Sequence, residues 1–331
     1  MKISWSVKLI DDPYEVLNYL QVGINIPVLE EFKEFILYDL NAFPSKSLLI
    51  MENDKITGHM LLFHDDSDTL YFGFFGTINI DKDLVEFMIQ YLKDYAKENH
   101  FHYIRGPINI PTIIYGWGFM GKNSIERQHR AKPVTPPLYL EMFLEHNFYI
   151  KTEEVSWEGD ISQVDLNQYN VSDETLDNFD LIDLQSWEDL DKYTTTILRL
   201  NKENMPSESI LTPSLERVVM NYMNFFRHFG DFYMVTFVQE KRTEKVVGYI
   251  SCLPDPFDNE AFCIFTLVID KEYRSKGLAW YLTRRALEKV RAHNLCYMSA
   301  PIEKNNKITQ LMCKSLGLQL LRSHIIVECK I

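Results

Sequence analysis

The chain has 331 residues, 46% of them hydrophobic, and a formal net charge of −13, which is the composition of an ordinary globular protein. That length exceeds what one hydrophobic core usually serves, so we expect two domains. The negative charge argues against a nucleic-acid or anionic-membrane partner, because binding phosphates requires clustered Lys and Arg, and it suits a cationic substrate.

The sequence predicts neither a membrane span nor a signal peptide, and its cysteines predict neither disulfides nor a metal site. The longest largely apolar run, Ala261–Ile269, is far shorter than the ~20 residues of a membrane span. Asp11 and Asp12 stand where a signal peptide would be apolar, so we expect a cytoplasmic protein. The five cysteines contain no C-x-x-C pair, which favours reduced, buried thiols over disulfides or a metal site, and we expect no metal.

In chain order, the first half begins with a helical stretch near Val28–Asp39. Two strands follow around the Asn53-Asp54 turn, the second of them after Gly58. A third strand over Leu70–Ile80 leads into an amphipathic helix over Leu84–Glu98. The order is therefore helix, hairpin, strand, helix.

The second half repeats this order, with helical patterns between Leu190 and His228 and then three strands and a helix. The expected ranges are Phe232–Val238, Val246–Cys252, Ala261–Ile269 and Leu278–Ala292. Gly58 and Gly248 lie 190 residues apart and Ile80 and Ile269 lie 189 apart, which indicates a tandem duplication. The polar stretch between the halves is typical of a linker, so we expect domains at 1–161 and 179–331 joined by a linker at 162–178.

One motif in the second half has the order strand, basic loop, helix. The strand that ends at Ile269 runs into Tyr273-Arg274-Ser275-Lys276-Gly277-Leu278-Ala279 and then into an apolar face of Leu278, Leu282, Ala286 and Val290. The first N–H groups of a helix are unpaired and carry a partial positive charge, so such a loop can bind an anion. Gly277 allows close approach of a phosphate, and Arg274 and Lys276 add charged donors.

At these residues the sequence resembles the GNAT superfamily of acyl-coenzyme-A N-acyltransferases, whose signature is Arg or Gln, two residues, Gly, one residue, then Gly or Ala. A downstream Asn306, a helix over Ile308–Leu316 and Gly317 before a strand at Ser323–Glu328 agree in order and spacing. The resemblance implies a mixed α/β (α+β) fold with a mixed sheet, present here as two tandem GNAT folds.

The resemblance also implies acetyl-CoA, or another acyl-CoA, as cosubstrate. Its pantetheine arm is expected along Leu267, Val268 and Ile269, hydrogen-bonded like an added strand where two sheet strands diverge. Its pyrophosphate is expected on the amides of Arg274, Ser275, Lys276, Gly277, Leu278 and Ala279, with Asn306 nearby.

The catalytic groups depart from the family pattern. The usual acid, a Tyr four residues before the glycine, is replaced by Cys313, which could donate a proton, carry the acyl group as an acyl-cysteine, or simply be buried. Glu303, after the fifth strand, is the candidate general base, and Asp258, Glu260 and His228 are alternatives. Each of these has a plain structural reading as a solvated acid or a helix-end residue.

The first half lacks the anion loop, because it has Ile80-Asp81-Lys82-Asp83-Leu84-Val85 at the matching place, with no glycine and two carboxylates. It therefore resembles a degenerate GNAT fold. Its Arg105–Phe119 stretch resembles a group of uncharacterised two-domain GNAT-like proteins.

Three functions fit this pattern. The first is an N-acetyltransferase acting on an amine of a small molecule or peptide by direct attack. The second is a non-catalytic acyl-CoA-binding or interaction module, favoured by the missing Tyr. The third, an aminoacyl or long-chain acyl transferase, would need an acyl pocket.

Overall fold

The computed structural model describes residues 4–65, 68–125, 130–169, 171–204 and 215–331. The chain forms two compact units. Unit 1 runs to Val155 and also includes Leu321–Ile331, whereas unit 2 is Ser156–Leu320. The chain passes from one unit to the other within two strands, β7 (Tyr149–Asp160) and β13 (Gln319–Lys330). The C-terminal strand thus belongs mostly to unit 1, which differs from the expected domain at 179–331.

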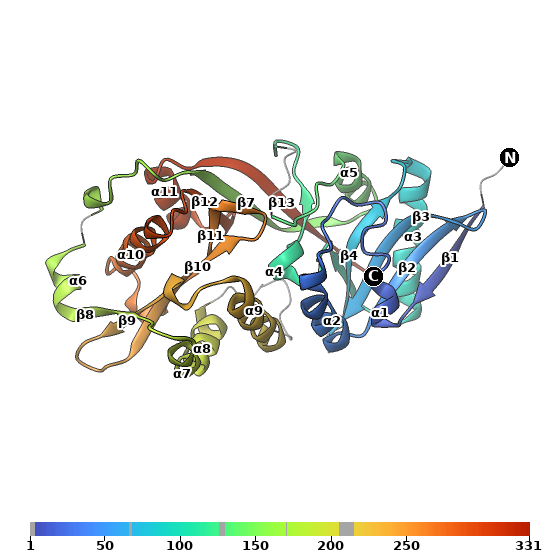
Figure 1. Cartoon of the computed structure of the whole chain (residues 1–331). Helices are drawn as coiled ribbons and strands as arrows, with labels where there is room; N and C mark the ends of the chain where they lie inside the picture. The colour runs from blue at the N-terminus through green and yellow to red at the C-terminus, as the bar shows by residue number, and fades with distance from the viewer. Residues whose placement is uncertain (1–3, 66–67, 126–129, 170, 205–214) are drawn as a thin grey trace. The chain divides into compact units, whose positions relative to one another are not determined.

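Unit 1 contains a sheet in the order β1-β2-β3-β4-β5-β13, with β6 beside β13 (Figure 1). The pairs from β1 to β4 are antiparallel and β4 with β5 is parallel. Its strands are β1 (Trp5–Ile10), β2 (Ser45–Glu52), β3 (Lys55–His64), β4 (Thr69–Thr77), β5 (Tyr103–Gly106) and β6 (Phe119–Met120). Its helices are α1 (Pro13–Val16), η1 (Glu30–Phe32), α2 (Lys33–Ala42), α3 (Lys82–Glu98), α4 (Thr112–Tyr115) and α5 (Pro137–Glu145).

Unit 2 contains a sheet in the order β7-β12-β11-β10-β9-β8, antiparallel from β8 to β11 and parallel between β11 and β12. Its further strands are β8 (Phe179–Asp183), β9 (Val235–Glu240), β10 (Val246–Asp255), β11 (Asp258–Ile269) and β12 (Tyr297–Glu303). Its helices are η2 (Leu166–Gln168), α6 (Asp173–Asn178), α7 (Trp187–Lys192), α8 (Thr194–Asn204), α9 (Leu215–Phe229), η3 (Phe232–Met234), η4 (Lys271–Tyr273), α10 (Leu278–Ala292) and α11 (Lys307–Ser315). Figure 1 shows α10 and α11 on one side of this sheet and α7, α8 and α9 on the other.

The two units repeat one order of elements, which confirms the mixed α/β fold with a mixed sheet. The strand register corrects the residue match, however. Gly58 pairs with Thr77 in unit 1, and Gly248 pairs with Ile269 in unit 2. Thr77, three residues before Ile80, is therefore the counterpart of Ile269.

Helix α10 is held against the sheet by its apolar face and by an ion-pair cluster. The four residues predicted to form that face, Leu278, Leu282, Ala286 and Val290, are all buried. On the same helix Lys289 Nζ lies 2.5 Å from Asp183 Oδ1, and Arg285 Nη2 lies 2.6 Å from Asp183 Oδ2. Burial alone would raise the pKa of Asp183, but hydrogen bonds from these two cations hold that pKa below its ordinary value.

The region between the halves is better packed than a linker. Residues 162–178 belong to unit 2, where η2 and α6 form from them. Helix α6 is capped by Ser172, whose side chain accepts a hydrogen bond from the Thr175 N–H.

Within the described residues, no helix has both the length and the apolar character needed to cross a bilayer.

Candidate coenzyme-binding site in unit 2

The loop between β11 and α10 has the conformation of an anion-binding turn. Ser275 and Gly277 adopt left-handed backbone angles, with φ of 62° and 75°, on either side of Lys276. Gly277 is the N-cap of α10 and provides no side-chain cap, so the first N–H groups of the helix are left for an external acceptor. Arg274, Ser275, Lys276 and Gly277 are all exposed, so the loop is accessible from solvent. The loop can therefore accommodate a pyrophosphate.

The two cations of the loop are partly engaged by the protein itself. Arg274 Nε donates to the Ile269 carbonyl at 3.2 Å, and Arg274 Nη2 donates to the Asn204 carbonyl at 3.4 Å. The Lys276 ammonium lies 4.9 Å from the centre of the Tyr273 ring, a cation–π contact. An anion at this loop would therefore meet exposed backbone amides as well as two basic side chains that already have partners in the protein.

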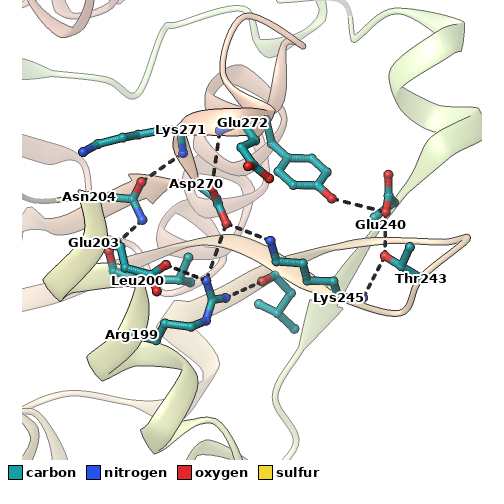
Figure 2. A network of polar contacts seen from close by, with 12 residues as sticks. Arg199, Leu200, Glu203, Asn204, Glu240, Thr243, Lys245, Asp270, Lys271 and Glu272 are labelled. Atoms are coloured by element: carbon teal, nitrogen blue, oxygen red, sulfur yellow. Dashed lines mark hydrogen bonds and ion pairs between the residues drawn. The ribbon is translucent and has the colours of Figure 1, made fainter.

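Asp270, immediately before the loop, is the centre of a network that fixes the start of the turn (Figure 2). Its Oδ2 lies 3.1 Å from Lys245 Nζ and 3.5 Å from Arg199 Nη1, and its Oδ1 accepts from the Glu272 N–H at 3.3 Å. Burial would raise the pKa of Asp270, but Lys245 and the Glu272 amide outweigh that effect and lower it. The charged form is thereby favoured, so Asp270 joins α8, β10 and the loop.

Asn204, the last residue of α8, attaches the same helix to the loop a second time. Its Oδ1 accepts a hydrogen bond from the Lys271 N–H at 2.9 Å, while its Nδ2 donates to the Leu200 carbonyl at 2.9 Å (Figure 2). No local motif in the sequence signals these contacts, since about seventy residues separate Asn204 from Lys271.

The expected divergence of two strands is present beside the loop. The described pairing of β12 with β11 covers Ala261–Cys263, although β11 continues to Ile269. Beyond Cys263 the residues from Ile264 to Leu267 are half-buried rather than buried. A bulge lies in this stretch, because Ser251 and Cys252 of β10 pair with Thr266 and Ile264, leaving Phe265 without a direct opposite.

A ligand that is extended along β11 could therefore use backbone groups that β12 leaves open. Of the three residues expected to hold such an arm, Leu267 is half-buried, and Val268 and Ile269 have buried side chains. Any hydrogen bond from these two to a ligand would come from the backbone, as expected.

A buried polar group that no local sequence signal marks lies behind this stretch. The Tyr249 hydroxyl and the Asn201 amide exchange hydrogen bonds at 3.0 and 3.2 Å, and Thr266 also bonds to that hydroxyl. Burial raises the pKa of Tyr249 to about 12, so the phenol stays protonated. On β11 the ring centroid of Phe265 lies 5.3 Å from that of Tyr222 on α9. Helices α8 and α9 thus cover the side of β11 where the bulge occurs.

Cys313 lies in α11 with 2% of its surface exposed. Burial raises the pKa of its thiol to about 12, which favours the neutral thiol near neutral pH and argues against a nucleophilic thiolate. The Leu318 N–H donates to the Cys313 carbonyl at 3.0 Å, and in unit 1 the Phe148 N–H donates in the same way to the carbonyl of Phe143, which lies in the aromatic core. Both units therefore bury this side chain.

The remaining candidates lie at the ends of strands and helices. Glu303 is exposed at the end of β12, the strand that diverges from β11, and Asn306 caps α11 by accepting from the Thr309 N–H at 3.2 Å. Asp258 and Glu260 lie at the start of β11, and Glu260 is seven residues or ~23 Å along the strand from Leu267. His228 lies in the last turn of α9. The structure brings Glu303, but not Asp258 or Glu260, to the diverging end.

In unit 1 the corresponding helix end is closed by the protein itself. The loop before α3 spans only residues 78–81, whereas the loop before α10 spans 270–277. Asp81 caps α3, and its Oδ1 accepts from the Asp83 and Leu84 N–H groups at 2.9 and 3.2 Å. The Asp81 carboxylate thus accepts hydrogen bonds from the first N–H groups of α3, whereas no described side chain caps the equivalent groups of α10.

The diverging strands of unit 1 are also occupied. The β4–β5 pairing covers Thr69–Tyr71, and beyond it the chain continues so that the Ile108 N–H donates to the Phe72 carbonyl at 2.7 Å. The Asn109 side chain then accepts from the Phe74 N–H at 2.7 Å. Gly73 allows this approach, because a side chain there would collide with the Ile108 carbonyl. The segment Ile108–Asn109 fills the place where β11 is open in unit 2.

Part of unit 2 is similar in sequence to known proteins. Residues 196–318 match the model of the acetyltransferase (GNAT) family. Over 99 residues, 30% of the chain, the sequence is 26% identical to the L-2,4-diaminobutyric acid acetyltransferase of Marinococcus halophilus and 23% identical to that of Halalkalibacterium halodurans. The matched stretch spans 58% and 52% of the lengths of those two relatives.

Solved structures extend the similarity to both units. A tandem GNAT protein from the clavulanic acid biosynthesis pathway aligns with a TM-score of 0.64 at 11% identity, covering 99% of this chain and 98% of that one. A GCN5-related N-acetyltransferase from Sphaerobacter thermophilus aligns with a TM-score of 0.60 at 7% identity, covering 98% and 95%. At these identities the similarity establishes the fold.

Proposed function

We propose that unit 2, whose residues 196–318 match the model of the acetyltransferase (GNAT) family, binds acetyl-CoA and transfers its acetyl group to an amine. The observation that carries the proposal is the loop at Ser275–Gly277, whose left-handed residues lead into a helix end without a side-chain cap. This geometry suits a pyrophosphate, and the open part of β11 beside it suits an extended arm.

The chemistry is a direct attack without an acyl-enzyme. The lone pair of a neutral amine adds to the thioester carbonyl carbon, the C–S bond then breaks, and the amine loses a proton as the thiolate leaves. The pKa of Cys313, raised to about 12, argues against an acyl-cysteine route. Glu303, at the diverging end of β12, is the candidate group to accept the amine proton.

The acceptor proposed is a small-molecule or peptide amine. The net charge of −13 favours a cationic acceptor, and the two curated relatives are named for a diamino acid. We therefore place 2,4-diaminobutyrate and other diamines first in a panel of amines, followed by short peptides with free amino termini.

The test combines binding and turnover. Acetyl-CoA binding is measured by calorimetry, and transfer to the amine panel is followed by release of the free thiol. Glu303→Gln should lower kcat by the 10²–10⁴ range typical of a general base, with little change in acetyl-CoA affinity. A wild-type protein that does not bind acetyl-CoA would refute the proposal, and an unchanged kcat in the variant would remove Glu303 from it.

A non-catalytic acyl-CoA-binding module is the second candidate, favoured by the burial of Cys313 where the family places an acid. Tight acetyl-CoA binding with no thiol release over the whole amine panel would support this second function instead.

A further inference from the structure

The described residues of the stretch 162–178 contact α10 near both ends of that helix. Near the helix C-terminus, Arg291 Nη2 donates to the Val164 carbonyl at 2.6 Å and also to the Ile161 carbonyl. At the first turn of the helix, the Tyr169 ring stacks on Trp280, with 4.5 Å between ring centroids and 11° between planes. The stretch that the sequence marks as a connection therefore lies against the helix that begins at the coenzyme loop.

Thr175 makes the contact of this stretch with the loop itself. Its side chain is buried, and its Oγ1 donates to the Lys276 carbonyl at 2.8 Å. Because that hydroxyl has a single hydrogen, the 2.8 Å contact between Thr175 Oγ1 and Ser172 Oγ must have Ser172 as donor. Ser172 Oγ in turn accepts from the Thr175 N–H at 3.2 Å. Both hydroxyls, of Ser172 and of Thr175, thus donate in the direction of the loop, which strengthens the hydrogen bond from Thr175 to the Lys276 carbonyl.

The direction of the Lys276 carbonyl determines the direction of the next amide. In a trans peptide the C=O and the following N–H point in opposite directions, so a carbonyl turned toward Thr175 turns the Gly277 N–H away from it. Lys276 and Gly277 are both exposed, so a ligand can reach the Gly277 N–H on the side away from Thr175. The flanking left-handed residues, Ser275 and Gly277, leave this peptide dependent on an external restraint.

We propose that Thr175, in the first part of unit 2, is a positioning residue for coenzyme binding. Its hydroxyl holds the Lys276 carbonyl and so presents the Gly277 N–H to the pyrophosphate. The inference rests on the proposed function of unit 2, and it extends the coenzyme site to a part of the chain outside the matched family region at 196–318.

The test uses two variants that differ by one hydroxyl. Thr175→Val keeps the shape of the side chain and removes the donor, whereas Thr175→Ser keeps the donor and removes a methyl group. Loss of this one hydrogen bond should weaken acetyl-CoA binding about tenfold in Thr175→Val, with Thr175→Ser close to wild type. Calorimetry supplies the dissociation constants, and thermal unfolding shows whether both variants fold.

A second ligand separates positioning from a general structural effect. S-acetylpantetheine lacks the pyrophosphate, so its dissociation constant, measured by NMR titration, should be the same in wild type and Thr175→Val. If Thr175→Val does not fold, Ser172→Ala, which removes the donor to Thr175 Oγ1, should show the same selective loss to a smaller degree.

The outcomes distinguish this inference from the function on which it rests. A wild-type protein without acetyl-CoA affinity refutes both. If the wild type binds, equal acetyl-CoA affinity in Thr175→Val, or equal losses for acetyl-CoA and S-acetylpantetheine, overturns the role of Thr175 alone.

Discussion

Replacing Gly277 by Glu is the most direct perturbation of the coenzyme loop. The residue has a φ of 75°, a left-handed conformation that costs an L-residue roughly 1–2 kcal/mol. The new Cβ would lie 3.3 Å from Thr175 Oγ1, a contact that requires a small adjustment. Both costs fall on the fold and are shared by any non-glycine residue, so they can be measured separately from binding.

The carboxylate adds a specific cost to phosphate binding. At a separation of ~5 Å and an effective dielectric constant between ~20 and ~80, two like charges repel by about 1–3 kcal/mol. A pyrophosphate with two negative charges is therefore repelled by about 2–6 kcal/mol, which corresponds to a loss of affinity of ~30-fold or more. Gly277→Gln has the same backbone and nearly the same volume without the charge, so the ratio of the two dissociation constants isolates the electrostatic part.

Calorimetric titration with acetyl-CoA at two salt concentrations is the assay. Gly277→Glu should bind at least 30-fold more weakly than Gly277→Gln, and the ratio should shrink at high salt because the Debye length falls. Thermal unfolding should show similar losses of stability in the two variants. Equal affinities in Glu and Gln variants would refute the placement of the pyrophosphate at this loop.

Three further results are expected. Calorimetry should give one acetyl-CoA per chain, because Asp81 caps the helix amides of unit 1 that α10 leaves open in unit 2. Cys313→Ala should lower the free energy of unfolding by ~1 kcal/mol and leave kcat within a few-fold of wild type, since a buried thiol fills space. Asp183→Asn should cost about 2–3 kcal/mol, because it leaves the buried Lys289 ammonium without its carboxylate. The depressed pKa of Asp183 also predicts a contribution present above pH ~4, the ordinary range of an unfolded Asp, and lost as pH falls through the lower folded value.

Each of these expectations has a contrary result. Two acetyl-CoA molecules per chain would show that unit 1 also binds, and a Cys313→Ala variant that folds but loses more than a hundredfold in kcat would restore the thiol as an acid. Urea unfolding of Asp183→Asn that matches wild type at pH 7, or wild-type stability that does not fall in acid, would contradict the role of the ion-pair cluster.

Periodicity in the sequence is enough to predict the elements near the site. The helix expected over Leu278–Ala292 has these bounds, and the strand expected over Ala261–Ile269 is the latter part of β11. These predictions succeed because an amphipathic helix and a buried strand leave local patterns of period 3.6 and of continuous apolarity. The match of Ile80 with Ile269 was wrong, because the short loop before α3 changes the spacing and only strand pairing shows it.

Some residues of the candidate site are likewise signalled by the local sequence, and others are not. Gly277 was singled out because a glycine in a basic loop before a helix allows close approach of a phosphate, and the structure adds that its φ is 75°. Thr175, Asn204 and Tyr249 were not, because each acts on residues far away along the chain and its own neighbours show nothing of that role. A Thr after a Ser cap is an ordinary helix start, and its hydrogen bond to Lys276 exists only in the folded chain.

By itself the sequence determined the kinds of element, their repeated order and the basic, glycine-containing loop before α10, since these depend on residues close together along the chain. The tertiary structure decided which amides remain open. The amides of α3 are capped by Asp81, whereas those of α10 are left to a ligand. It also decided that 162–178 lies on α10 instead of joining two domains loosely, because polar composition predicts exposure and cannot predict a hydrogen bond between Thr175 and Lys276.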